Sequence, residues 1–126
     1  MVQYGLNDRH GFFVVHESKG WRTACHSSEP TVNGAGALKE WGIHVDSEEA
    51  FVLLCGKGVL AVMDDGGQVR ITQMEPLQMY VVGAGEKHAI ALDQGSRVLI
   101  MENEDMSRFQ TLEMEDGVRE SICRAL

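Results

Sequence analysis

The chain has 126 residues and a formal net charge of -8, a length that fits one domain, residues 1–126, with a core of its own. Its 11 Lys and Arg residues are scattered, which excludes the clustered positive charge needed to bind nucleic acid. No apolar run approaches the ~20 residues that span a bilayer, and the N-terminus shows no apolar signal core. We therefore expect a cytoplasmic protein with no membrane partner.

Short β-prone runs follow one another along the chain, separated by turn residues. Their composition and alternation predict strands at 12–15, 21–25, 37–44, 49–55, 59–63, 68–74, 78–82, 87–92 and 97–101. Residues 118–126 fit either a short helix or a last strand. About nine strands at hairpin spacing, with little helix, predict an all-β sandwich or barrel.

The strongest turn signal is Asp64-Asp65-Gly66-Gly67. Asp-Gly supplies the positive φ angles of a tight hairpin turn. We therefore expect residues 59–63 and 68–74 to form a hairpin remote from any site, with Gly66 in the left-handed conformation.

Several cysteines and histidines, which could in principle bind metal or react, lie outside any motif. The cysteines are odd in number and widely spaced, so neither a disulfide framework nor a cysteine zinc site is expected; they are Cys25, Cys55 and Cys123. Three histidines in the first third have no ligand-like spacing, and we expect structural or surface roles for them: His10, His16 and His26.

Two other stretches gather the side chains best suited to bind a metal. In the first, His44 and Glu49 stand ahead of an apolar run that ends at Gly56. In the second, His88 closes the turn-like sequence Gly83-Ala-Gly85-Glu-Lys-His88. Two imidazoles and one carboxylate can hold a transition metal or perform acid–base chemistry.

The spacing of these stretches resembles that of the cupins, a family of small double-sheet jelly-roll barrels. The first cupin motif is glycine, five residues, His-x-His, three or four residues, Glu, six residues, and Gly. Gly36, His44, Glu49 and Gly56 stand at that spacing, while Gly42 replaces the first histidine. The second motif contains Pro-x-Gly-x-x-His, and Gly83 replaces its proline. The likeness covers residues 36–102 and is greatest to the small cupin-2-like barrels.

This resemblance implies a double-stranded β-helix with His44, Glu49 and His88 inside the barrel. It also implies a divalent transition metal as cofactor: Fe, Mn, Ni or Zn. Because cupins host many chemistries, two functions stay open. One is a metal-binding cupin that acts on or binds a small molecule, with catalytic residues that the sequence does not identify. The other is a metal-free cupin that binds or senses a small molecule without catalysis.

The period of two along each strand predicts what surrounds the site. We expect a cavity lined by Glu40, Gly42, Phe51, Met63, Met79, Leu99 and Met101. The opposite strand faces carry apolar side chains that a chain of this length leaves uncovered: Trp41, Ile43, Ala50, Val52 and Leu54. We therefore expect a homodimer in which these residues form the interface.

Overall fold

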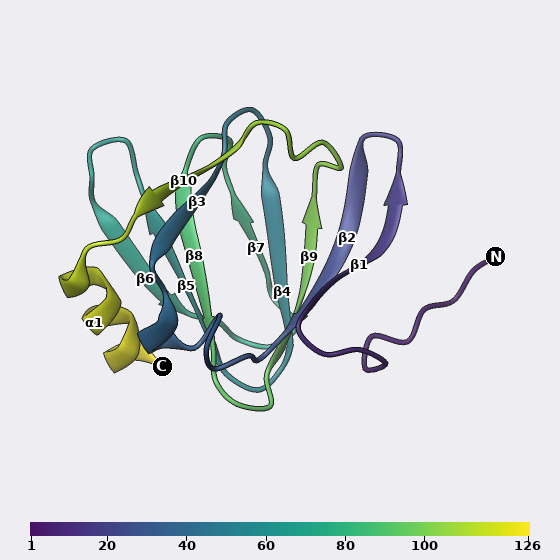
Figure 1. Cartoon of the computed structure of the whole chain (residues 1–126), viewed down its shortest axis with the longest axis horizontal. Helices are drawn as coiled ribbons and strands as arrows, with labels where there is room; N and C mark the ends of the chain where they lie inside the picture. The colour runs from purple at the N-terminus through teal and green to yellow at the C-terminus, as the bar shows by residue number, and fades with distance from the viewer.

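The computed structural model describes residues 1–126, which form two packed antiparallel sheets of five strands each (Figure 1). The first sheet has the order β1 (Phe12–Ser18), β2 (Trp21–Ser27), β9 (Arg97–Glu102), β4 (Glu49–Cys55) and β7 (Met79–Val82). The second has the order β10 (Phe109–Glu113), β3 (Glu40–His44), β8 (Lys87–Leu92), β5 (Gly58–Met63) and β6 (Val69–Gln73). The expected all-β double-sheet fold is confirmed.

The chain passes between the sheets through short connections, which place motif residues on facing walls. A 3-10 turn, η1 (Ala35–Ala37), precedes β3, and the turn 45–48 carries the chain from β3 in the second sheet to β4 in the first. Another turn, 83–86, leads from β7 back to β8. Within it Gly85 adopts a φ of 81° and donates its N–H to the carbonyl of His44 at 2.7 Å. This contact ties the second motif to the first.

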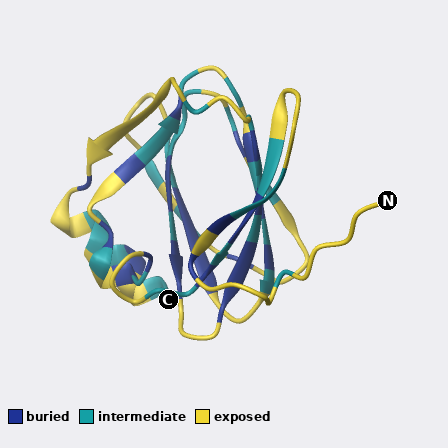
Figure 2. Cartoon of the chain, turned by 45° about the vertical axis from the view of Figure 1, so that its right-hand side comes forward, coloured by how far each residue is buried: buried dark blue, intermediate teal, exposed yellow.

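Two apolar clusters stabilise the arrangement. One lies between the sheets and has Phe51, Leu53, Leu60, Val98 and Ile100 among its members. The other lies on the outer face of the second sheet, where α1 (Asp116–Ala125) covers it with the fully buried Ile122. Figure 2 shows buried residues along the central strands and in the helix, and exposed residues in most of the loops and at the N-terminus. Because the helix covers this face, Trp41 is 1% exposed and is buried within its own chain.

The structure differs from the sequence expectation at the C-terminal end. The tenth strand, β10, was not predicted, because all five of its residues are exposed and no side of it alternates between apolar and polar. Residues 116–125 are helical, which resolves the choice between helix and strand in favour of the helix. No helix combines the length and the apolar character needed to cross a membrane.

The apolar residues expected to form one dimer interface lie on two different sheets. Trp41 and Ile43 belong to β3 in the second sheet, whereas Ala50, Val52 and Leu54 belong to β4 in the first. Alternation predicts the face of a strand on which a side chain lies, but it carries no information on which sheet each strand joins. Trp41 is also among the residues that line the cavity described below. The five residues therefore do not form a single surface, and the expectation that they make one interface is wrong.

Candidate metal centre

Three side chains from three strands meet inside the sandwich near one end. His44 is the last residue of β3 and His88 the second of β8, and both strands belong to the second sheet. Glu49 is the first residue of β4 in the first sheet. The pairing of Gly42 with His88 sets the register of β3 on β8 and places His44 two residues further along the same face, diagonally beside His88. The residues from His44 to Glu49 therefore span the crossing of the chain from the second sheet to the first.

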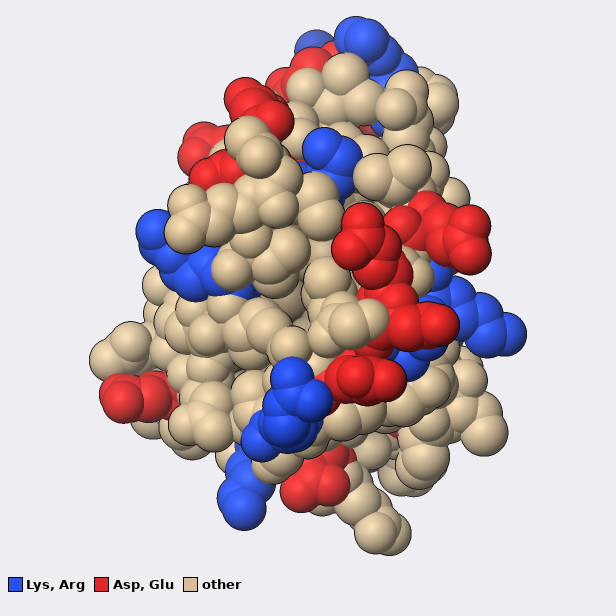
Figure 3. Space-filling view, turned by 90° about the vertical axis from the view of Figure 1, so that its left-hand side faces the viewer, with Lys and Arg blue, Asp and Glu red and all other residues tan.

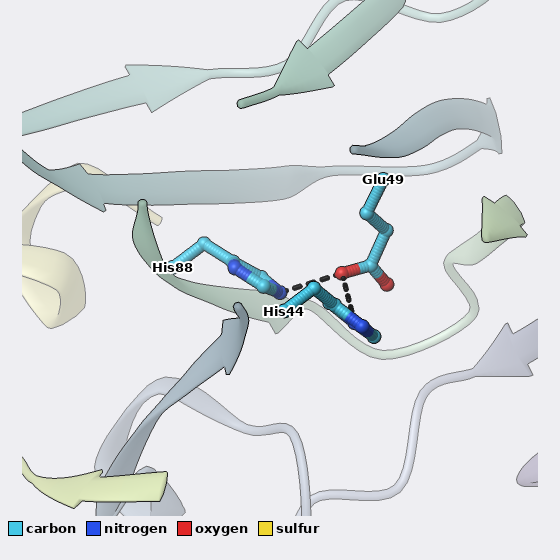
Figure 4. A group of neighbouring side chains, drawn as sticks. All are labelled: His44, Glu49 and His88. Atoms are coloured by element: carbon cyan, nitrogen blue, oxygen red, sulfur yellow. Dashed lines mark ion pairs between the residues drawn. The ribbon is translucent and has the colours of Figure 1, made fainter. Parts of the chain in front are cut away.

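Figure 4 shows both imidazoles directed at the Glu49 carboxylate. Glu49 Oε2 lies 2.6 Å from His88 Nε2 and 2.9 Å from His44 Nε2. The two rings stack at a centroid distance of 5.6 Å and an interplanar angle of 10°. All three residues are buried, and one potential ligand atom from each falls within 4.8 Å of the others. The arrangement therefore presents three donor atoms to a common point.

The hydrogen bonding of Glu49 indicates which kind of group could bind where the three side chains converge. Despite the short separations, the buried Oε2 oxygen of this residue has no hydrogen-bond partner. An unpaired buried carboxylate oxygen costs free energy unless something else satisfies it. A divalent cation would do so, since imidazole and carboxylate are its usual protein ligands. The residues present therefore fit a metal ion.

The electrostatics of the cluster favour an ionised carboxylate. Burial alone would raise the pKa of Glu49, but the close His44 and His88 rings together outweigh burial and lower this pKa to about 2. Contact with the Glu49 carboxylate also raises the pKa of His44, against the opposing effect of burial. A proton therefore competes with a metal at the His44 imidazole and hardly at all at Glu49.

The cluster opens into a cavity of about 410 Å³ between the two sheets. Of the residues expected to line it, Glu40, Gly42 and Phe51 do so. The others lie on the alternate, outward-facing positions of their strands or at the edge strand β7, and do not line it: Met63, Met79, Leu99 and Met101. On β9, for example, Val98 and Ile100 belong to the core between the sheets, so Leu99 and Met101 point the other way.

A larger hollow, of about 540 Å³, lies between β6 and β7. It contains none of the three cluster residues, and its walls include the charged side chains Asp64, Arg70 and Glu86. The chemistry of the cluster therefore belongs to the smaller cavity.

Two charged residues of the cavity wall were missed by sequence reasoning. Glu102 ends β9, and Arg22 is its cross-strand neighbour on β2. Arg22 donates to Glu102 Oε2 from Nε at 2.8 Å and lies 2.7 Å from it through Nη2. Burial and the nearby Glu49 carboxylate raise the pKa of Glu102, while Arg22 opposes this rise. Glu102 could have been found from strand alternation, because it lies on the same face of β9 as the core residues Val98 and Ile100.

Phe109 is another cavity residue that was missed. It pairs with His44 across β10 and β3, and its ring lies 5.0 Å from the His44 ring. A Cβ atom at Gly42 would stand 3.1 Å from two carbons of the Phe109 ring. The space that the first motif histidine would enter is therefore occupied by an aromatic ring from β10. No sequence signal marked this strand.

The remaining histidines divide into two kinds. His26 lines the cavity away from the cluster, beside Glu29 at 3.4 Å, and burial lowers its pKa despite that neighbour. His10 and His16 do not line the cavity, and His16 contacts the Tyr4 hydroxyl at 2.9 Å. Asp46, close in sequence to His44, lies in the turn and pairs with Arg108 at 2.8 Å. None of these four belongs to the three-residue cluster.

Comparison with known proteins supports the fold. No protein-family model matches the chain, and no curated protein matches it. Among solved structures it is similar to a cupin-2 domain protein from Shewanella frigidimarina, with a TM-score of 0.58 and 22% identity over 79% of this chain and 86% of that one. It is also similar to an RmlC-like cupin protein from Desulfovibrio desulfuricans, with a TM-score of 0.54 and 18% identity over 82% and 96% of the two chains.

A third similar structure is a variant of oxalate decarboxylase from Bacillus subtilis, with a TM-score of 0.61 and 15% identity. The match covers 91% of this chain but 33% of that one, so the chain spans about a third of the enzyme's length. Another structure of the same enzyme, at a TM-score of 0.55, is described by its Mn(II) centers. These likenesses show that the chain adopts the cupin fold, as the motif spacing indicated.

Proposed function

We propose that this chain is a metal-binding cupin in which His44, Glu49 and His88 hold a divalent transition metal for a small molecule bound in the cavity. The observation that carries the proposal is the buried, unpartnered Glu49 Oε2 with an imidazole nitrogen on each side at 2.6 and 2.9 Å. Support comes from the Mn(II) centers of the similar oxalate decarboxylase. Fe, Mn, Ni and Zn are the candidate ions.

A divalent cation held there would supply Lewis acidity toward a carbonyl or carboxylate oxygen of the bound molecule. The chain itself supplies a cavity of about 410 Å³, within the range typical of small-molecule sites. Phe51, Ile100 and Phe109 give apolar walls, and Arg22 and Glu102 place charged groups beside the cluster. Three protein ligands leave coordination positions for water or substrate. This arrangement suits both an enzyme and a binding protein.

The Phe109 ring favours a second candidate function, a metal-free cupin that binds or senses a small molecule. An aromatic ring stands where the resemblance predicts a ligand histidine. A cavity with this apolar wall would bind a ligand through shape and burial rather than through a metal. The two candidates differ in one measurable property, which is the metal content of the purified protein.

The decisive experiment is elemental analysis of protein purified without chelator or polyhistidine tag, followed by calorimetric titration of Fe(II), Mn(II), Ni(II) and Zn(II). We expect near-stoichiometric metal in the wild type and its loss in His44→Ala and His88→Ala, because two protein ligands bind too weakly to compete with water and buffer. His10→Ala is the matched control and should keep its metal. Well-folded wild-type protein that binds none of the four ions would leave the metal-free function.

We also propose that the chain forms a homodimer through the outer face of the first sheet. Met79 and Val81 on β7 are 58% and 57% exposed. Beside them β4 carries the outward-facing, half-buried Ala50, Val52 and Leu54. A contiguous exposed apolar face usually marks an interface. On the opposite side of the molecule, α1 covers the second sheet (Figure 1).

Nucleic acid does not fit the α1 face of the molecule as a partner. Figure 3 shows the face of the molecule that carries α1, where Lys and Arg side chains form separate spots divided by neutral and acidic atoms. The net charge of -8 adds a repulsive term for any polyanion. A small neutral or metal-coordinating molecule in the cavity is the partner that the charges support.

A further inference from the structure

A second buried carboxylate faces the cluster from the first sheet. The Glu102 side chain is 4% exposed, and its Oε1 lies 3.9 Å from His44 Nε2. It lies on the cavity wall with His44, Glu49 and His88. We propose that Glu102 is a fourth protein ligand of the metal, an inference that rests on the function proposed above. The chain would then provide two imidazoles and two carboxylates.

Arg22 orients this carboxylate. Its Nε and Nη2 both approach the same oxygen, Glu102 Oε2, at 2.8 and 2.7 Å. A guanidinium that holds one oxygen through two nitrogens fixes the plane and direction of the carboxylate. The other oxygen, Oε1, is therefore left for the cluster and is turned toward His44. Arg22 also balances the charge of Glu102, which allows a second carboxylate to stay beside Glu49 in a buried wall.

The separations agree with a shared ion. Ligand atoms about 2.1 Å from one metal stand roughly 3 Å apart when at right angles and roughly 4.2 Å apart when opposite. Glu49 Oε2 lies 2.6 and 2.9 Å from the two histidine nitrogens, close to the first value. The 3.9 Å between Glu102 Oε1 and His44 Nε2 falls between the two values.

Glu102 also compensates for the position that Gly42 leaves without an imidazole. In the native chain the second sheet offers no donor at that position, because residue 42 is glycine and the Phe109 ring stands 3.1 Å from where its Cβ atom would be. The first sheet, in contrast, places the Glu102 carboxylate beside the cluster. Apart from Glu49 and Glu102, the other carboxylate on the cavity wall is Glu40, which is exposed at the start of β3 in the second sheet.

The test compares Glu102→Gln with Glu40→Gln, which removes a carboxylate from the same cavity wall. Affinity for Co(II) is measured by calorimetry, and the ligand environment is followed by the visible absorption spectrum of the bound Co(II). We expect Glu102→Gln to weaken binding by about 100-fold, at the upper end of the 10–100-fold range seen when residues behind the ligands are lost. We expect it also to change the spectrum. Glu40→Gln should alter neither quantity.

A second variant guards against misfolding, because Glu102→Gln removes the closer acidic partner of the half-buried Arg22 and leaves only Glu17, at 3.9 Å. The double variant Arg22→Leu/Glu102→Leu replaces the pair with apolar side chains, a change that is often neutral or stabilising. It should show the same loss of affinity and the same kind of spectral change. A wild-type Co(II) spectrum in both variants would overturn the assignment of Glu102 as a ligand, whatever their affinity. Absence of Co(II) binding by the wild type would instead overturn the proposed metal function.

Discussion

At the residue scale, Gly42 and Phe109 together determine how many imidazoles the centre contains. The glycine has no side chain to offer, and the ring from β10 occupies the adjoining space at 3.1 Å from the missing Cβ. Phe109 is 40% exposed on an edge strand, so the ring can turn toward solvent. Restoring the motif histidine therefore requires the ring to move.

We predict that Gly42→His tightens Ni(II) binding by about tenfold, equivalent to about 1.4 kcal/mol, when Phe109→Ala is also present. In the presence of Phe109 the gain should be smaller, because part of the binding free energy is spent on displacing the ring. The comparison is a double-mutant cycle measured by calorimetry, with Phe109→Ala as the reference for the double variant. Equal gains in both backgrounds would contradict the steric role of Phe109.

The raised pKa of His44 leads to a prediction on pH. With a metal absent, stability due to protonated His44 is present below its ordinary value of 6.5 and is lost as the pH rises through the raised folded-state pKa. The metal requires the neutral imidazole, so metal affinity has the opposite slope and rises over the same interval. Glu49, whose pKa is about 2, stays ionised throughout.

Two measurements check this prediction between pH 6 and pH 8.5. Chemical unfolding of chelator-treated protein should show stability falling with pH, and calorimetric metal titration should show affinity increasing. The number of protons released on binding, obtained in buffers of different ionisation enthalpy, should decline toward the upper end of the range. Metal affinity that is flat across this interval would rule out His44 as a ligand.

At the element scale, the β5–β6 hairpin shows how turn chemistry was predicted to within one residue. The turn forms where expected, with Gly67 N–H donating to the Asp64 carbonyl at 3.0 Å and Gln68 N–H to Asp64 Oδ1 at 2.9 Å. The left-handed residue is Gly67, with a φ of 82°, and not Gly66 as expected. Two consecutive glycines leave the sequence without a means of choosing between them.

We predict that Gly67→Ala destabilises the fold by about 1–2 kcal/mol, the cost of a left-handed L-residue, and that Gly66→Ala costs less. A Cβ at Gly66 would meet only Asp64 Oδ1, at 3.3 Å. Thermal unfolding of the two variants provides the comparison. Metal content should be unchanged in both, since neither glycine lines the cavity. A larger loss for Gly66→Ala would reverse the assignment of the turn.

The strands themselves were largely predictable from the sequence, and the cluster was expected from the resemblance to the cupin motifs. Each of the nine expected runs lies on a strand, because alternating or apolar segments between turn residues have few other ways to bury their side chains. His44, Glu49 and His88 converge as the motif spacing required. Strand β10 was not predicted, because its residues are exposed and show no alternation of apolar and polar side chains. The parity of β9 could have placed Glu102 inward, but its pairing with Arg22 could not be predicted, because it depends on β2 lying beside β9.

At the scale of the whole molecule, the outer face of the first sheet leads to a prediction on assembly. Sedimentation equilibrium at micromolar concentration should show a dimer of the wild type. Val81→Glu should dissociate it, because a carboxylate buried in an apolar interface lacks a partner. Leu112→Glu is the matched control, since Leu112 is 46% exposed but lies on β10 in the second sheet. A monomeric wild type would remove this proposal.

The three cluster residues have a consequence for the sandwich as a whole, because they are divided between its two sheets. The apolar core fastens the sheets at the Leu53 and Leu92 end, whereas His44 and His88 face Glu49 across the cavity end. A bound ion would act there as a removable cross-link, and saturation at 1,000 times its dissociation constant would add about 4 kcal/mol to stability. Amide hydrogen exchange should then slow at the cavity ends of β3 and β4 and stay constant in β6. The concentration of available metal would thereby set the stability of the contact between the two sheets and the frequency with which the cavity end opens to a ligand.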